Sequence, residues 1–161
     1  MVYRIRNMKA TKEQLEFCEK HTLTFDQFTG KEKIDGSLYL VSECKLIEGF
    51  NPTVGGHLFI HSVTELIEGF NPTVGGHLYM SLVTKLIKGF NPTVGGSLHI
   101  HSVTELVEGF NPTVGGDFRM NSVTILPEGF NPTVGGNLYL RSVEDKSTIN
   151  YTKLEGDFID F

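Results

Sequence analysis

The string Gly-Phe-Asn-Pro-Thr-Val-Gly-Gly at residues 49–56 occurs five times in this chain, at a constant spacing of 20 residues. The other four copies occupy residues 69–76, 89–96, 109–116 and 129–136. A strict period this short indicates a solenoid, in which each copy is one turn that buries its apolar side chains against the next turn. The repeat therefore predicts the architecture, and function has to be sought in the positions that differ between copies.

Each glycine pair is followed by a short segment in which apolar and variable residues alternate, as in Ser97-Leu-His-Ile. Alternation with a period of two is typical of a strand with one buried face. The residues predicted to point inward are Leu38, Leu40, Leu58, Ile60, Leu78, Met80, Leu98, Ile100, Phe118, Met120, Leu138 and Leu140. We therefore predict an all-β fold, a parallel β-solenoid of about six 20-residue rungs over residues 34–143, with rungs roughly 4.8 Å apart.

The rest of each copy supplies further inward apolar residues. In the second copy, residues 62–67 are predicted to form a second short extended segment with Val63 and Leu66 inward. Phe70 and Val74 are also predicted to be buried, on either side of an Asn-Pro step that favours a turn. The glycine pair that follows is predicted to permit a corner.

The N-terminal segment is not repetitive and is predicted to cap the array, because a solenoid exposes apolar surface at its ends. Residues 1–33 form this predicted helical cap, which begins with a capping box over residues 11–14. Leu15 and Cys18 lie three apart and are predicted to share the buried face of the helix, with Phe17 off that face.

Further features mark the borders of the array. A second short helical turn is predicted at residues 24–28. Glu43 occupies an inward position that is Val in later copies, as expected of a turn that touches a cap. Residues 144–161 lose the repeat, although residues 156–161 weakly echo the start of a rung, and this segment is predicted to be a C-terminal cap or tail.

Composition limits the classes of function. The chain has 161 residues and a net charge of −5, which does not support direct binding to nucleic acid, since that needs a basic face. No run of about 18 apolar residues is present, so no membrane-spanning helix is predicted. The N-terminus has no secretory signal pattern, and Cys18 and Cys44 are interpreted as free thiols, so we expect a cytoplasmic protein.

Residues 123–130, Val-Thr-Ile-Leu-Pro-Glu-Gly-Phe, follow Phe118-x-Met120 and resemble a leucine-rich repeat. The ladder-forming Asn that follows the strand in that family is missing and the coil is shorter, which favours a straighter β-solenoid. The array more closely resembles the Phe-Asn-Pro-Thr-Val-Gly-Gly repeat proteins of phage and bacterial genomes. This resemblance implies a phage or mobile-element origin and no particular activity.

The outward strand positions vary between copies and define a candidate binding face about 30 Å long. Its central column is Tyr39, Phe59, Tyr79, His99, Arg119 and Tyr139. Histidines flank this column on both sides, at His57, His77, His61 and His101. Aromatic and Arg side chains dominate the energetics of many protein interfaces, which favours a recognition surface. Stacked aromatics also stabilise parallel rungs by themselves, and this structural interpretation stays open.

Other columns suggest weaker hypotheses. Histidines on a flat face do not converge as metal ligands must, so no metal or other cofactor is predicted. The Thr column that starts at Thr53 suggests ice binding as a hypothesis. The column is single, however, and each Thr follows Pro in a predicted turn, so this hypothesis has little support. The Glu column that starts at Glu48 and Glu68 is interpreted as a solvated face, or as an imitation of a phosphate backbone. No catalytic motif or phosphate-binding loop is present, so no enzymatic activity is predicted.

These observations favour a non-enzymatic binding module that recognises a protein partner through the aromatic and His face. The phage resemblance suggests an inhibitor or decoy of a host factor. Two alternatives stay open at this point: a carbohydrate-binding solenoid whose aromatic side chains stack on sugar rings, and a structural, self-assembling component of a particle. The sequence does not decide the oligomeric state.

Overall fold

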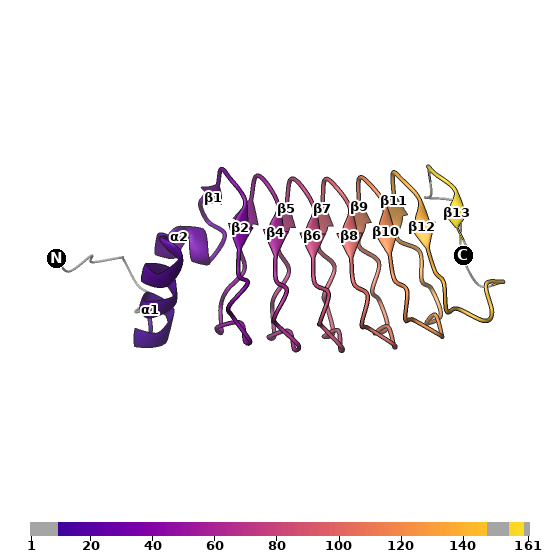
Figure 1. The fold of residues 1–161 in the computed structure, drawn as a ribbon, viewed down its shortest axis with the longest axis horizontal. Coiled ribbons are helices and arrows are strands. Elements are labelled where there is room, and N and C mark those ends of the chain that lie inside the picture. The colour runs from indigo at the N-terminus through magenta and orange to yellow at the C-terminus, as the bar shows by residue number, and fades with distance from the viewer. Residues whose placement is uncertain (1–9, 148–154, 160–161) are drawn as a thin grey trace.

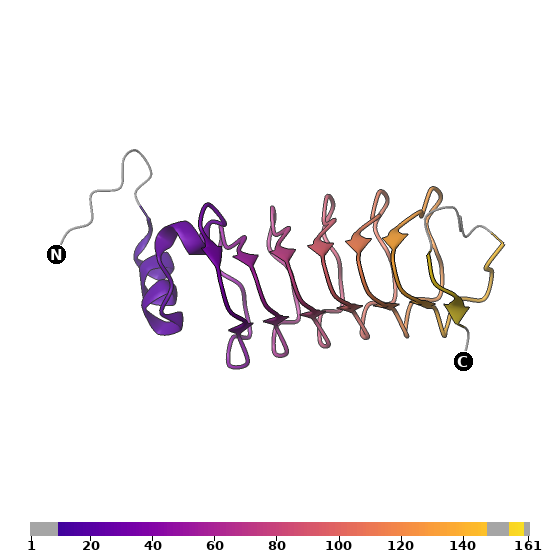
Figure 2. The same ribbon diagram turned by 90° about the horizontal axis from the view of Figure 1, so that it is seen from above.

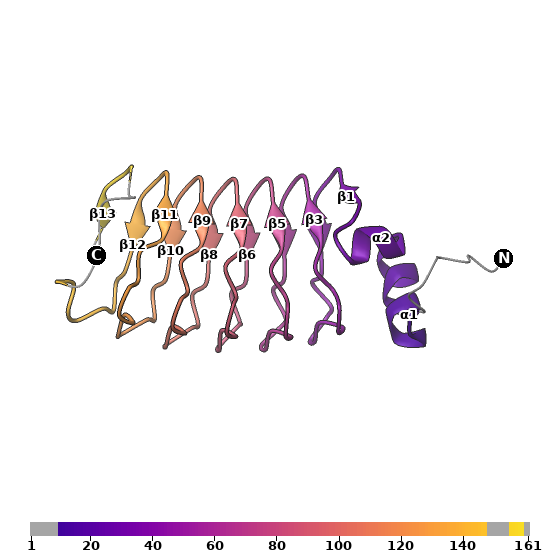
Figure 3. The same cartoon turned by 180° about the vertical axis from the view of Figure 1, so that it is seen from behind.

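The computed structural model describes residues 10–147 and 155–159 and shows a parallel β-solenoid (Figure 1). Its turns lie side by side along one nearly straight axis with two helices at one end, as the views from opposite sides show (Figures 1 and 3). Parts of the predicted caps, residues 1–9, 148–154 and 160–161, lie outside the described residues. No helix in the described part of the chain is long and apolar enough to cross a membrane.

One sheet, sheet B, consists of the strands that the alternating pattern predicted, and each strand is two residues long. Each strand pairs in parallel with the strand one repeat away. The strands are β2 (Leu38–Tyr39), β4 (Leu58–Phe59), β6 (Leu78–Tyr79), β8 (Leu98–His99), β10 (Phe118–Arg119), β12 (Leu138–Tyr139) and β13 (Phe158–Ile159). The last of these confirms that the C-terminal echo of the repeat adds a strand to the array.

The second sheet, sheet A, comes from residues that we expected in a turn. Its strands are β1 (Lys33–Ile34), β3 (Thr53–Val54), β5 (Thr73–Val74), β7 (Thr93–Val94), β9 (Thr113–Val114) and β11 (Thr133–Val134). Proline can precede such a strand because only its carbonyl is needed: Thr73 N donates to Pro52 O at 3.3 Å. The two β-branched residues that follow favour the extended conformation. Viewed from above, the two sheets form two separate rows of strands (Figure 2).

The prediction of an extended segment at residues 62–67 is wrong in its secondary structure and right in its burial. Glu65 makes only an isolated bridge to Lys85, whereas Val63 and Leu66 are buried as predicted. The segment bends at Ser62 and ends in a tight turn, in which Phe70 N donates to Ile67 O at 3.1 Å. This arm of each turn therefore contributes apolar side chains to the core without forming a sheet.

The core runs along the whole array between the two sheets. All the predicted inward strand residues are buried, together with the Val of each Thr-Val strand in the repeats. A column of phenylalanines runs beside them with successive ring centroids 5.4–6.1 Å apart. Its members are Phe28, Phe50, Phe70, Phe90 and Phe110. The cap and the repeats thus share one continuous core, since Phe28 belongs to the cap segment.

The three glycines of each repeat have two different roles. The left-handed φ lies at the glycine before each Phe, such as Gly69 with φ 77°, and not in the glycine pair. In the pair, a Cβ atom on Gly75 would lie only 2.4 Å from Gly55 O. The pair lies at the predicted corner, where the chain bends from sheet A to sheet B, and it is also needed because the backbones of successive turns approach closely there.

An asparagine ladder is present at another position, inside the repeated string. Asn71 N donates to Asn51 Oδ1 at 2.7 Å, and Asn91 N donates to Asn71 Oδ1 at 2.9 Å. Asn71 Nδ2 in turn donates to Gly89 O at 3.2 Å. No Asn ladder follows sheet B, as expected from the sequence, and the ladder that is present lies before sheet A, where it was not predicted.

The N-terminal cap contains the two predicted helices, α1 (Lys12–His21) and α2 (Phe25–Phe28), each with a capping box. The prediction of the buried face of α1 is right for Cys18, which is buried. It is wrong for Leu15, which is 53% exposed, and for Phe17, which is only 4% exposed although it was expected off the buried face. Phe17 packs on Phe28 and Phe50, with centroids 5.6 and 5.1 Å away. The phenylalanine column therefore decides which face of the helix is buried.

Glu43, the unusual inward residue of the first turn, binds the cap. Its Oε1 accepts hydrogen bonds from Lys20 Nζ and, at 2.8 Å, from His21 Nε2. Burial raises the pKa of Glu43, but the two hydrogen bonds and the nearby positive charges outweigh it and hold the pKa below its ordinary value. The cysteines are free thiols: Cys44 is exposed and Cys18 is buried, which raises the Cys18 pKa.

Candidate binding face

All ten residues predicted for the binding face lie along sheet B. The six of the central column occupy the second position of the strands from β2 to β12. His57 and His77 directly precede strands, and His61 and His101 lie two residues after strand ends. Tyr39 is 57% exposed, and the other nine are half-buried. The structure thus brings the predicted residues to one side of the molecule.

The central column is a continuous stack of rings. The centroids of Tyr39 and Phe59 are 4.7 Å apart, and those of Phe59 and Tyr79 are 4.8 Å apart. His99 follows Tyr79 at 4.5 Å with its plane tilted by 19°. The inner rings are therefore covered on both faces by their neighbours, so that they present their edges to solvent.

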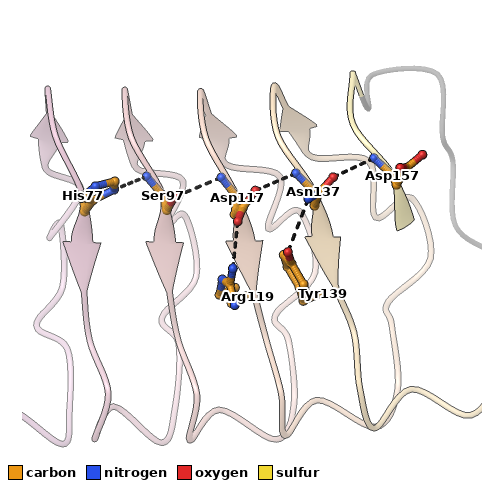
Figure 4. A network of polar contacts seen from close by, with 7 residues as sticks. All are labelled: His77, Ser97, Asp117, Arg119, Asn137, Tyr139 and Asp157. Carbon is orange, nitrogen blue, oxygen red and sulfur yellow. Dashed lines mark hydrogen bonds and ion pairs between the residues drawn. The ribbon is translucent and has the colours of Figure 1, made fainter. Parts of the chain in front are cut away.

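The stack ends in a cation–π contact at the C-terminal end of the face. Arg119 Cζ lies 4.0 Å from the centroid of the Tyr139 ring. The same guanidinium donates to Asp117 Oδ2 at 2.9 Å (Figure 4). Arg119 is thus fixed between an aromatic ring and a carboxylate, and its position in the column matches that of the rings before it.

The column that directly precedes the strands forms an acceptor ladder. Each of its side chains accepts a hydrogen bond from the backbone N–H one turn further along. The members of the acceptor ladder are Ser37, His57, His77, Ser97, Asp117 and Asn137. The donor–acceptor distances run from 2.7 to 3.1 Å, and the ladder ends at Asp157 N (Figure 4).

The acceptor ladder explains variation that we interpreted as a sign of recognition. Ser, His, Asp and Asn differ in size and charge, yet each holds an acceptor close enough to the backbone to reach the next amide. The signal was present in the sequence, because every residue of this column bears such an acceptor. Hydropathy patterns do not group these four residue types together, so the role was missed.

The ladder also fixes the neutral tautomer of two histidines. His57 Nδ1 accepts from His77 N at 2.8 Å, and His77 Nδ1 accepts from Ser97 N at 2.7 Å. A nitrogen that accepts a hydrogen bond carries no proton, so each neutral ring carries its proton on Nε2. The two rings stack at 4.7 Å with nearly parallel planes.

The carboxylate of Asp117 binds two neighbours on the same face. Asp117 Oδ1 accepts from Asn137 N at 2.9 Å while Oδ2 accepts from Arg119. The backbone hydrogen bond from Asn137, and then the hydrogen bond and charge of Arg119, outweigh burial and hold the Asp117 pKa below its ordinary value. Asp117 therefore stays ionised and paired at neutral pH.

The next two histidines are neutral at pH 7. Burial, together with the charges of His101, Arg119 and His77, lowers the pKa of His99 to about 4 against the opposing charge of Asp117. Burial and then the charge of Arg119 lower the pKa of His101. His101 Nδ1 lies 3.1 Å from Asn121 Nδ2. Neither His99 nor His101 therefore adds positive charge to the face at neutral pH.

The remaining surfaces hold the other residues that the sequence singled out. The Thr column lies on sheet A, exposed after its first member Thr53, and not in a turn as expected. The Glu column lies on exposed turns, where Lys88 interrupts it. Within the described residues no group of three or more His, Cys, Asp or Glu side chains is placed to hold a metal ion.

Comparison with known protein families, curated proteins and solved structures finds no match to this chain.

Proposed function

We propose that this chain is a non-enzymatic binding module that recognises a protein partner through the sheet B face. The stack of the central column is the observation that supports this proposal. Its rings are already held by their neighbours at 4.5–4.8 Å, so they lose little conformational freedom when a partner binds. Rigid aromatic side chains of this kind give contact area at a low entropic cost.

The same stack favours a protein over a carbohydrate. Stacking on a sugar requires an open aromatic face, whereas Phe59 and Tyr79 are each covered on both faces. Ring edges carry partial positive charge and suit the carbonyl and carboxylate groups of a protein surface. The resemblance to phage and bacterial repeat proteins makes a host factor the first class of partner to test, with this chain as its inhibitor or decoy.

Site-specific photo-cross-linking tests this proposal. A photo-reactive phenylalanine analogue replaces Tyr79 in one variant and Thr93, on sheet A, in a control variant. In a lysate of the host, we expect the analogue at position 79 to label one defined protein and the analogue at position 93 to leave it unlabelled. Equal labelling from both positions, labelling from neither, or cross-linking only to a second copy of this chain contradicts the proposal.

A further inference from the structure

The acceptor ladder has a chemical consequence for the sheet B face. Each ladder side chain directs an acceptor atom at a backbone N–H of the next turn, and in His57 and His77 this occupies the single lone pair of Nδ1. Ser37 and Ser97 keep their O–H groups as donors, and His57 and His77 keep their Nε2–H groups. The histidines of the ladder therefore present only donors outward, and the serines keep a donor as well.

The side chains that carry these donors are half-buried, so that part of each is open to solvent. Asn131 Oδ1 is the one buried side-chain nitrogen or oxygen of the described residues that has no hydrogen-bond partner. The Nε2 atoms of His57 and His77 are therefore not buried unpaired atoms, and both side chains are half-buried at the surface. Tyr139 adds a further donor, since its hydroxyl oxygen lies 3.4 Å from Asn137 Nδ2 and accepts from it.

The charged groups of the face do not favour one sign. Arg119 is paired with Asp117, whose other oxygen accepts from Asn137 N, and the exposed Arg141 lies on the same face. Asp157 is an exposed carboxylate at the C-terminal end of the ladder. Over the other turns the face presents the ladder donors and ring edges, so its complementarity to an acidic partner rests on hydrogen-bond donors.

We infer that the partner of this face is a protein segment rich in Asp and Glu, whose carboxylates accept hydrogen bonds from the donors that the ladder leaves exposed. This inference rests on the proposed function, because it states the chemistry of the protein that the same face binds. Carboxylates form stronger hydrogen bonds with such donors than neutral groups do.

The test uses peptides selected from a random dodecapeptide display library against the whole chain. Selected peptides are measured against Ser81→Glu and Ser81→Lys, which place opposite charges of similar size between His61 and His101. Thr93→Glu and Thr93→Lys make the same changes on sheet A as matched controls. Circular dichroism melts show that each variant is folded.

We expect the selected peptides to be enriched in Asp and Glu at least twofold over the library. Ser81→Glu should weaken their binding about tenfold, Ser81→Lys should preserve or strengthen it, and the sheet A variants should have no effect. His57→Ser with His77→Ser should weaken binding about tenfold, since Ser keeps the ladder acceptor, as at positions 37 and 97, and removes the Nε2 donors.

Other results overturn the inference in separable ways. Equal weakening by Ser81→Glu and Ser81→Lys, or weakening by Lys alone, rejects an acidic partner and leaves the proposed function standing. Tighter binding of a single-stranded oligonucleotide of twelve residues than of any peptide identifies phosphate as the preferred acceptor and rejects a protein segment. Peptides unaffected by every sheet B variant, or a selection without binders, count against the inference and the proposed function together.

Discussion

Two glycines in each repeat are required for different physical reasons. Gly89 has a φ of 82°, but a Cβ atom there would meet no atom within 4 Å. Gly95 has no left-handed φ, but a Cβ atom would lie 2.4 Å from Gly75 O. The first glycine is needed for its backbone conformation and the second for the close approach of two backbones, which no rotamer change can relieve.

Alanine substitutions should separate these two requirements. We expect Gly89→Ala to lower the free energy of unfolding by about 1 kcal/mol, the usual cost of a left-handed residue with a Cβ atom. Gly95→Ala should lower it by about 3 kcal/mol, because the backbones of two turns must move apart. Urea denaturation of both variants checks this, and equal effects would show that the turns are free to shift.

At the scale of single elements, the docking of α1 depends on one aromatic side chain. Phe17 is buried against Phe28 and Phe50, the first members of the phenylalanine column, while Leu15 on the same helix is exposed. We expect Phe17→Ala to cost about 3 kcal/mol or more and to release α1, since it removes a buried ring. Leu15→Ala should cost less than about 0.5 kcal/mol.

Hydrogen exchange distinguishes release of the helix from general loss of stability. In Phe17→Ala, the amides of α1 should lose protection while those of sheet B in the central turns keep theirs. A uniform loss of protection along the chain would mean that the cap and the array unfold as one unit.

Which elements were predictable depends on how local their determinants are. The strands of sheet B follow from alternation within four residues, and residues such as Leu58 and Ile60 are buried as expected. Sheet A was missed because the local Asn-Pro signal for a turn competes with pairing to Thr-Val segments 20 residues away. The face of α1 was misassigned because a helix of ten residues offers several apolar faces, and Phe50, far away in sequence, selects one.

The candidate site shows the same division. The sequence predicted which side chains share one side of sheet B, since they share a strand position. It did not predict that Ser97 and Asp117 accept backbone hydrogen bonds, because that role depends on the distance between turns. The variation between copies therefore mixes positions constrained by the ladder with positions open to recognition.

Sheet B also makes stability depend on pH through His99. Its pKa is about 4 in the folded chain, against 6.5 as the ordinary value. Between these values the unfolded chain binds a proton that the folded chain does not, so the free energy of unfolding falls as the pH falls from 6.5 toward 4. Above pH 6.5 this contribution is fully present.

A tyrosine at this position should remove that contribution. Position 79 shows that the column accepts tyrosine, so His99→Tyr keeps the stack. We expect His99 to lower the free energy of unfolding by on the order of 1 kcal/mol as the pH falls from 6.5 to 4; the effect is small because solvent screens a half-buried ring. The free energy of unfolding of the variant should therefore depend less steeply on pH. Urea denaturation across this range measures it, and an unchanged slope in the variant would contradict the assignment.

At the scale of the whole molecule, the inner turns are interchangeable units. Sheet pairing, the phenylalanine column, the asparagine ladder and the acceptor ladder all join residues 20 positions apart. Deleting residues 77–96 would join Gly76 to Ser97, so that Ser97 N meets His57 Nδ1 as it now meets His77 Nδ1. The contacts of one turn are lost, and those of its neighbours are restored between new partners.

This deletion should give a shorter but folded solenoid. We expect the free energy of unfolding to fall by about 1–3 kcal/mol, in proportion to the residues removed. Deleting only residues 77–86 is the matched control. It leaves half of one turn, which is too short to bring the chain back to the equivalent strand position on the next rung. That variant should lose cooperative unfolding and aggregate. Circular dichroism melts with light scattering separate the two outcomes; if both deletions unfold the chain, stability depends on the particular order of turns and not on their shared 20-residue contacts.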